Sequence, residues 1–114
     1  DLSPLEACIA TAESADAVDL LPAPIEAPYL RELRGTPALR IAMLDAFDAA
    51  TDRLSAEFAR RLDLAPEDLE VRQTAAAVAS SLQEVFFQWA TVGDGYDIQD
   101  AALESFRRLK RGLR

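Results

Sequence analysis

Histidine is absent from this chain, and its absence excludes several kinds of catalysis at once. Histidine is the commonest general base, the usual activator of nucleophiles and the commonest transition-metal ligand. The single cysteine, Cys8, cannot form an internal disulfide or a thiolate zinc site. A di-iron helical bundle would need Glu-x-x-His pairs, and none occur. The sequence therefore predicts a protein that is not an enzyme and that carries no metal or other cofactor.

Glycine is scarce, and long apolar runs are missing. Four glycines beside abundant alanine and leucine favour an all-helical fold, which leaves no strand for a phosphate-binding glycine loop to follow. No apolar run approaches the roughly 20 residues that span a bilayer. The first residues lack the basic segment and apolar core of a signal peptide. We expect a single soluble, cytoplasmic domain over residues 1–114, with no membrane contact.

Basic residues are the minority, with 12 Lys and Arg against 20 Asp and Glu and a net charge of −8. An acidic surface repels phosphate backbones, so the chain itself is a poor candidate for nucleic-acid binding. The exception is a basic group at the end of the chain, for which the simplest role is to complement a helix dipole. This group comprises Arg107, Arg108, Lys110, Arg111 and Arg114.

The apolar periodicity predicts about five helices in an antiparallel bundle. Ser3-Pro4-Leu5-Glu6 is a capping pattern that opens a helix fading near Ser14, with Cys8 on its apolar stripe. A proline-rich connector follows over residues 15–28. A short helix over 29–34 and a long helix from Pro37 to about Leu62 come next. The last helix is expected after Asp97, with Asp97 and Asp100 at its start.

The helix predicted over 66–92 is the centre of the bundle. Pro66 can occupy its first position, and Gly93 is a natural stop. One apolar stripe repeats at spacings of three and four, and a second, thinner stripe follows another side. The helix is therefore either the centre of a monomeric bundle or a helix with one face in its own core and the other against a second copy. The first stripe comprises Val71, Ala75, Val78, Leu82, Val85 and Trp89, and the second Thr74, Ala77, Ser81 (or Val78) and Phe86.

Apolar and aromatic side chains are the remaining candidates for a functional site, because ligand pockets are mostly apolar with a few polar groups. At helical spacing such residues are more often ordinary core, and both interpretations stay open at this point. The candidate ligand-binding residues are Met43, Phe47, Phe58, Phe86, Trp89, Cys8 and Tyr29. Thr74, Gln83 and Gln88 are candidate polar lining.

Residues 29–113 resemble the C-terminal regulatory domain of TetR-type transcriptional repressors. The resemblance rests on four features in order: Arg34-Gly35-Thr36-Pro37-Ala38-Leu39 after the short helix, the link Leu64-Ala65-Pro66-Glu67-Asp68, the alanine-rich helix ending at Trp89, and the final helix after Asp97. It implies an all-helical domain that binds a small effector and pairs with a second copy through its last two helices. The implied interface residues are Ala76, Ala79, Ser80, Gln83, Phe87, Ala102, Phe106 and Leu109.

The resemblance also implies a function in bacterial transcription regulation. An apolar or amphipathic effector would shift the operator affinity of a helix-turn-helix domain, and nothing in this sequence matches such a domain. DNA binding is therefore expected only through a domain that this chain lacks. The alternative is a ligand-free helical module that binds another protein.

Overall fold

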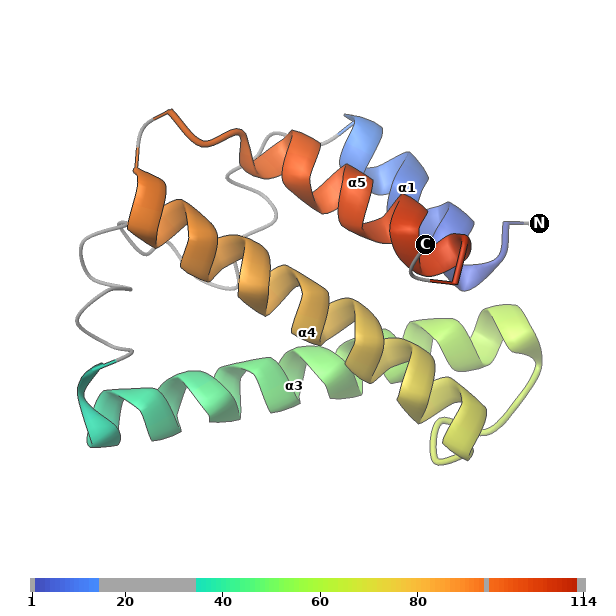
Figure 1. The fold of residues 1–114 in the computed structure, drawn as a ribbon. Coiled ribbons are helices and arrows are strands. Elements are labelled where there is room, and N and C mark those ends of the chain that lie inside the picture. The colour runs from blue at the N-terminus through green and yellow to red at the C-terminus, as the bar shows by residue number, and fades with distance from the viewer. Residues whose placement is uncertain (1, 15–34, 94, 113–114) are drawn as a thin grey trace.

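The computed structural model describes residues 2–14, 35–93 and 95–112 (Figure 1). In these residues the chain forms helices and no strand, in the order α1 (Pro4–Ser14), α3 (Pro37–Leu62), α4 (Leu69–Val92) and α5 (Ile98–Lys110). The all-helical prediction is confirmed. The predicted connector over 15–28 and the predicted short helix over 29–34 lie outside the described residues, so four of the five expected helices can be compared.

The start of α1 follows the capping pattern in its sequence. The Ser3 amide donates to Glu6 Oε1 at 3.2 Å, and the Glu6 amide donates to Ser3 Oγ at 3.3 Å. These two bonds satisfy amides that a helix start otherwise leaves without partners. The same bonding lowers the pKa of the Glu6 carboxyl, with a smaller contribution from the charge of Lys110.

Helices α3 and α4 form an antiparallel hairpin, as their short connection requires (Figure 1). α3 begins at Pro37 and ends at Leu62, and the capping residue Asp63 takes the left-handed conformation at φ 54°. α4 begins at Leu69, three residues later than predicted. The Asp68 carboxylate accepts a bond from the Ala65 amide at 3.3 Å. This bond closes a turn that contains Pro66, so the proline belongs to the link and not to the helix.

An arginine joins the two helices of the hairpin near that link. Arg72 Nη1 on α4 donates to Asp52 Oδ1 at 2.8 Å and to Ser55 Oγ at 3.1 Å, both on α3. Ser55 is 1% exposed and is the buried polar residue of the described core. Because the bond from Arg72 satisfies its hydroxyl, this burial carries no unmet polar group.

α5 packs against both α1 and α4. Its start is capped as predicted, with the Asp100 amide donating to Asp97 Oδ1 at 3.0 Å. Gln99 Nε2 donates to the carbonyl of Ala12 at 2.7 Å, which satisfies a carbonyl in the last turn of α1. α5 therefore fixes the position of α1 by a polar contact as well as by packing.

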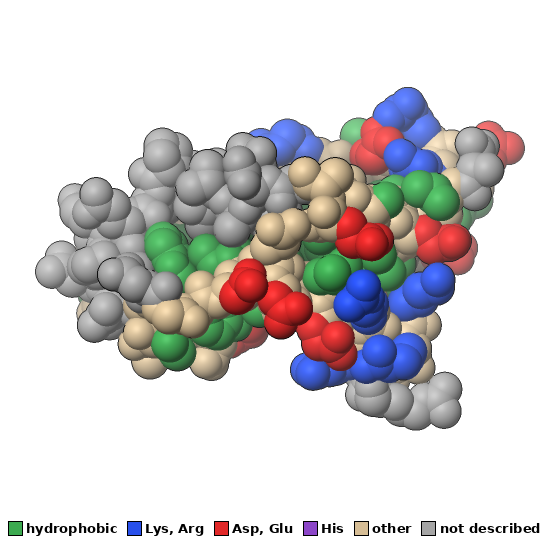
Figure 2. Space-filling view, turned by 90° about the horizontal axis from the view of Figure 1, so that it is seen from above, with side chains coloured by type: hydrophobic (Ala, Val, Ile, Leu, Met, Phe, Trp, Pro, Cys, Tyr) green, Lys and Arg blue, Asp and Glu red, His purple; other side chains and the backbone are tan. Residues whose placement is uncertain are grey.

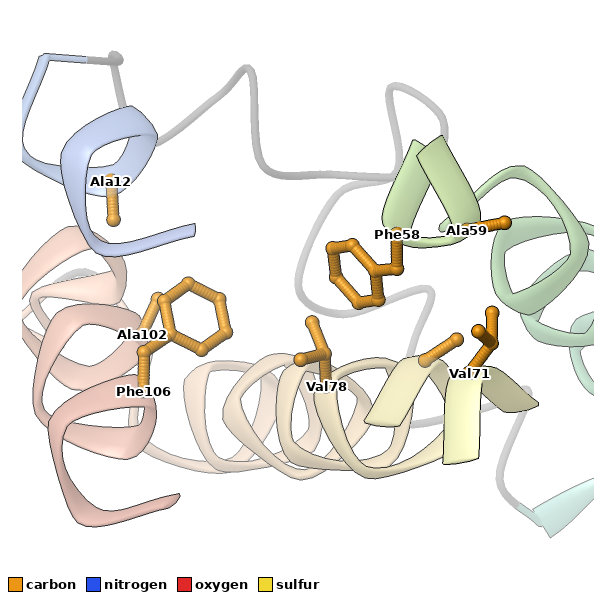
Figure 3. Close-up of a cluster of buried hydrophobic side chains, with 8 residues drawn as sticks. Ala12, Phe58, Ala59, Val71, Val78, Ala102 and Phe106 are labelled. Atoms are coloured by element: carbon orange, nitrogen blue, oxygen red, sulfur yellow. The ribbon is translucent and has the colours of Figure 1, made fainter. Parts of the chain in front are cut away.

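The core has two parts, one towards each end of the α3–α4 hairpin. The first cluster lies at the end away from the α3–α4 link, and the second cluster lies near the link. The second cluster joins all four described helices (Figure 3). In it Phe58 of α3 and Phe106 of α5 approach Val78 of α4 from two sides, and Ala12 of α1 lies over α5. Met43, Phe47 and Phe58 of α3 are buried, whereas Leu44 on the same helix is 45% exposed.

Candidate functional site

The first core cluster lies between the N-terminal half of α3 and the C-terminal half of α4. It is made of Met43 and Phe47 from α3, Val85, Phe86 and Phe87 from α4, and Ile98 from α5. The rings of Phe47 and Phe86 have centroids 6.1 Å apart and planes tilted by 36°, a favourable geometry for an aromatic pair. Trp89 and Tyr96 are partly buried against this cluster.

Four of the seven ligand-binding candidates therefore lie together: Met43, Phe47, Phe86 and Trp89. Two others, Phe58 and Cys8, belong to the second cluster, which lies between α1, α3, α4 and α5. Leu82 packs against both clusters and connects them. The seventh candidate, Tyr29, lies outside the described residues. The sequence named all seven as candidates because of their apolar or aromatic character, but it could not divide them between two clusters.

Cys8 lies among the apolar side chains of the second cluster, as its place on the apolar stripe of α1 predicted. Burial raises the pKa of its thiol to about 11, and the charge of Arg61 opposes this only in part. A thiol with so high a pKa is a poor nucleophile, because the thiolate is the reactive form. The sequence could not show that Arg61, far away along the chain, is a neighbour.

The outer side of the α4–α5 pair carries an open groove of about 450 Å³. α4 contributes Ser80, Ser81, Glu84, Val85 and Gln88, and Tyr96, Ser105 and Arg108 complete it. Partial burial raises the pKa of the Tyr96 hydroxyl, so the group is neutral at physiological pH. Apart from Val85 and Tyr96 the walls are small or polar side chains. Of these eight residues only Ser80 was among the predicted interface residues, and Gln88 was a candidate for ligand lining.

The structure divides the eight predicted interface residues into two sets. Ala79, Phe87, Ala102 and Phe106 are buried within the single chain. Ala76 and Ser80 are exposed, and Gln83 and Leu109 are partly exposed. Since helix spacing alone does not tell which stripe of a two-sided helix faces its own core, the sequence could not make this division.

Charged side chains gather around the end of α5. Figure 2 shows Lys and Arg side chains clustered at the lower right of the face seen from above, beside a row of Asp and Glu. The last turn of α5 carries Arg107, Arg108 and Lys110, where cations complement the helix dipole. Arg111 is paired with Glu104 at 3.3 Å.

The described residues contain neither a grouped set of metal ligands nor a helix that could cross a membrane. Within residues 2–14, 35–93 and 95–112, no three His, Cys, Asp or Glu side chains are grouped so that they could hold a metal ion. None of the four described helices combines the length and the apolar character that a transmembrane span needs. What this part of the structure presents is an apolar cluster inside the hairpin and a polar groove outside α4 and α5.

The two-cluster bundle belongs to a known family of regulatory domains. Residues 30–114 match the family model of the MftR C-terminal domain, a TetR-type C-terminal domain. The match covers most of the chain, so this chain belongs to that family of TetR-type C-terminal regulatory domains. No curated protein and no solved structure matches the chain.

Proposed function

We propose that this chain is the effector-binding and dimerisation domain of a TetR-like bacterial repressor, and that its effector binds at the first core cluster. The observation that carries the proposal is the family match over residues 30–114, because domains of this family belong to transcription regulators. The structure supplies a suitable place, since Met43, Phe47, Phe86 and Trp89 converge between α3 and α4.

The chemistry of this cluster favours an apolar or amphipathic effector. Its members are aliphatic, aromatic and thioether side chains, and no charged residue is among them. A strongly anionic molecule would lose its hydration there without gaining a counter-charge. A short acyl chain or a flat aromatic molecule would instead bury apolar surface at about 25 cal/mol per Å².

The effector would act by a population shift. If it binds more tightly to one arrangement of α3 against α4, it raises the population of that arrangement by its differential affinity. In the proposed repressor, that arrangement sets the spacing of two DNA-reading domains. Operator affinity then changes by the same coupling free energy.

Dimerisation is proposed through the outer side of α4 and α5. The outward side of α4 near its middle carries Ala77, Ser80 and Ser81, which are small and exposed or partly exposed. Small side chains allow two helix backbones to approach closely. A second copy of the chain, turned about a twofold axis, would form a four-helix bundle with this pair.

The experiment that tests the effector site uses Trp89, which is the single tryptophan of the chain. N-phenylnaphthylamine, a neutral apolar fluorophore, should bind saturably, change the Trp89 emission and be displaced by medium-chain alcohols. Phe47→Leu should weaken its binding by about 1 kcal/mol, because the substitution removes contact area from the site. Phe58→Leu makes the same change in the second cluster and serves as the matched control.

Equal weakening by both substitutions would assign the effect to general loosening of the core and contradict this placement. A complete lack of saturable binding, with Trp89 emission unchanged, would contradict the effector-binding function. The ligand-free interaction module would then be the better description of the chain.

A further inference from the structure

The α4–α5 groove contains one acidic and one basic side chain that do not form an ion pair with each other. Glu84 of α4 and Arg108 of α5 both line the groove, and both are exposed. Neither makes an ion pair with any other residue in the described part of the chain. The nearby Glu104 is different, because it is already paired with Arg111.

The two charges come from the two helices that form the groove, Glu84 from α4 and Arg108 from α5. α4 and α5 run antiparallel (Figure 1), and Ser80, Ser81 and Ser105 all line the groove that these helices form. Glu84 follows Ser80 and Ser81 by four and three residues, and Arg108 follows Ser105 by three. At 1.5 Å per residue, each charge is displaced by about 5 Å towards the C-terminus of its own helix. Because the helices are antiparallel, these displacements point in opposite directions.

A twofold axis that lies in the interface, passes between Glu84 and Arg108 and is perpendicular to the line joining them makes the groove complementary to itself. Such an axis exchanges the two positions, so Glu84 of one copy comes opposite Arg108 of the other copy. The symmetry repeats this relation, which gives two equivalent acid–base pairs across one interface. The small serine side chains between them leave room for the two pairs of helices to approach.

We propose that Glu84 and Arg108 form reciprocal ion pairs between two copies of this chain and thereby set the register of the dimer. The proposal rests on the dimerisation proposed above and adds the residues that fix how the two copies align. Charge pairs of this kind contribute more to specificity and register than to total affinity.

Charge reversal tests the pairing. Arg108→Glu places two acids opposite each other twice in the homodimer, and Glu84→Arg does the same with two bases. Each single variant should raise the dimer dissociation constant about tenfold at low salt, because two favourable pairs become two repulsive ones. Sedimentation equilibrium of the full chain measures this constant.

Restoring complementarity is the decisive comparison. The double variant Glu84→Arg/Arg108→Glu should dimerise like the original chain, since both pairs are present in reversed order. An equimolar mixture of the two single variants should form heterodimers in preference to either homodimer, because only the mixed pair has both contacts. Arg107→Glu is the matched control: it makes the same charge change one residue away, outside the groove, and should leave the constant within about twofold.

Two results would overturn the pairing while leaving the proposed dimer in place. The single variants could dimerise as tightly as the original chain, or the double variant could be as weak as the single ones. A chain that remains monomeric at every concentration would instead contradict the dimerisation proposal itself, and the pairing with it.

Discussion

The thiol of Cys8 makes the free energy of unfolding depend on pH in the alkaline range. Its pKa rises from 9.0 to about 11 on folding because burial disfavours the thiolate. Below pH 9 the thiol is protonated in both states, so it makes no difference to stability. Between pH 9 and 11 the unfolded chain loses this proton while the folded chain keeps it, and the free energy of unfolding falls as pH rises.

We therefore expect urea unfolding to show a loss of stability of order 2 kcal/mol between pH 8 and pH 11 that depends on Cys8. In Cys8→Ala this part of the pH dependence should disappear, although Tyr96 still titrates. The difference between the two chains at each pH isolates the thiol. Identical pH profiles would show that Cys8 is accessible to water in the folded state.

Single residues also show where sequence reasoning reached its limit. The sequence predicted Phe47, Phe86 and Val78 as apolar-face residues, and all three are buried. The sequence placed Ala75 and Ala77 in apolar stripes of α4, but the pattern could not decide which alanines are buried, because alanine is compatible with core, surface and helix contact alike. Ala75 and Ala79 are buried, whereas Ala76 and Ala77 are exposed, and only the packing of α3 and α5 around α4 decides this.

At the level of whole elements, α1 depends on α5 for its place in the bundle. Gln99 on α5 donates to the carbonyls of Ala12 and Glu13, and Arg61 of α3 donates to the carbonyl of Leu2 just before α1. Apolar packing in the second cluster completes the attachment. Gln99→Ala should therefore release the end of α1 at a cost of about 1 kcal/mol. Hydrogen exchange should show about fivefold less protection of α1 amides, with the α3–α4 hairpin unchanged.

Gln73→Ala is a suitable control for that measurement, since Gln73 is an exposed glutamine on α4. If Gln99→Ala lowered protection equally in α1, α3 and α4, α1 would open only with global unfolding. The polar contact would then have no separate role in holding this helix.

Element boundaries were predictable where local chemistry decides them. The cap of α1 at Ser3, the start of α3 at Pro37 and the start of α5 after Asp97 are confirmed, because each depends on side chains within three or four residues. The start of α4 was predicted wrongly at Pro66. There the bond between Asp68 and Ala65 closes a turn first, and the antiparallel hairpin needs that turn to reverse the chain.

At the scale of the whole molecule, the outer side of α4 is a surface that can be changed without disturbing the core of the chain. Ala77 is exposed on α4, three and four residues before Ser80 and Ser81. Ala77→Arg should change the solution mass measured by light scattering from twice 12.4 kDa to 12.4 kDa at micromolar concentration. Arginine has good helix propensity, so the helix itself should persist.

Ala56→Arg is the matched control, because Ala56 is an exposed alanine on α3 and lies outside the proposed interface. A dimer that survives Ala77→Arg would place the interface elsewhere on the molecule. Ala79 is unsuitable for this test even though it was an interface candidate. It is 4% exposed, so a charge there would disrupt the fold of one chain before it separated two.

The hydrogen bonds of Arg72 hold α3 and α4 together at one end of the hairpin. Asp52 and Ser55 are tied to α4 near the link, while the first cluster lies at the other end of the hairpin. From Ser55 back to Pro37, α3 extends about 27 Å at 1.5 Å per residue. A rotation of roughly 5° about the tied end would move the start of α3 by about 2 Å. A molecule bound between Phe47 and Phe86 would therefore displace α3 most at its N-terminal end, near Pro37.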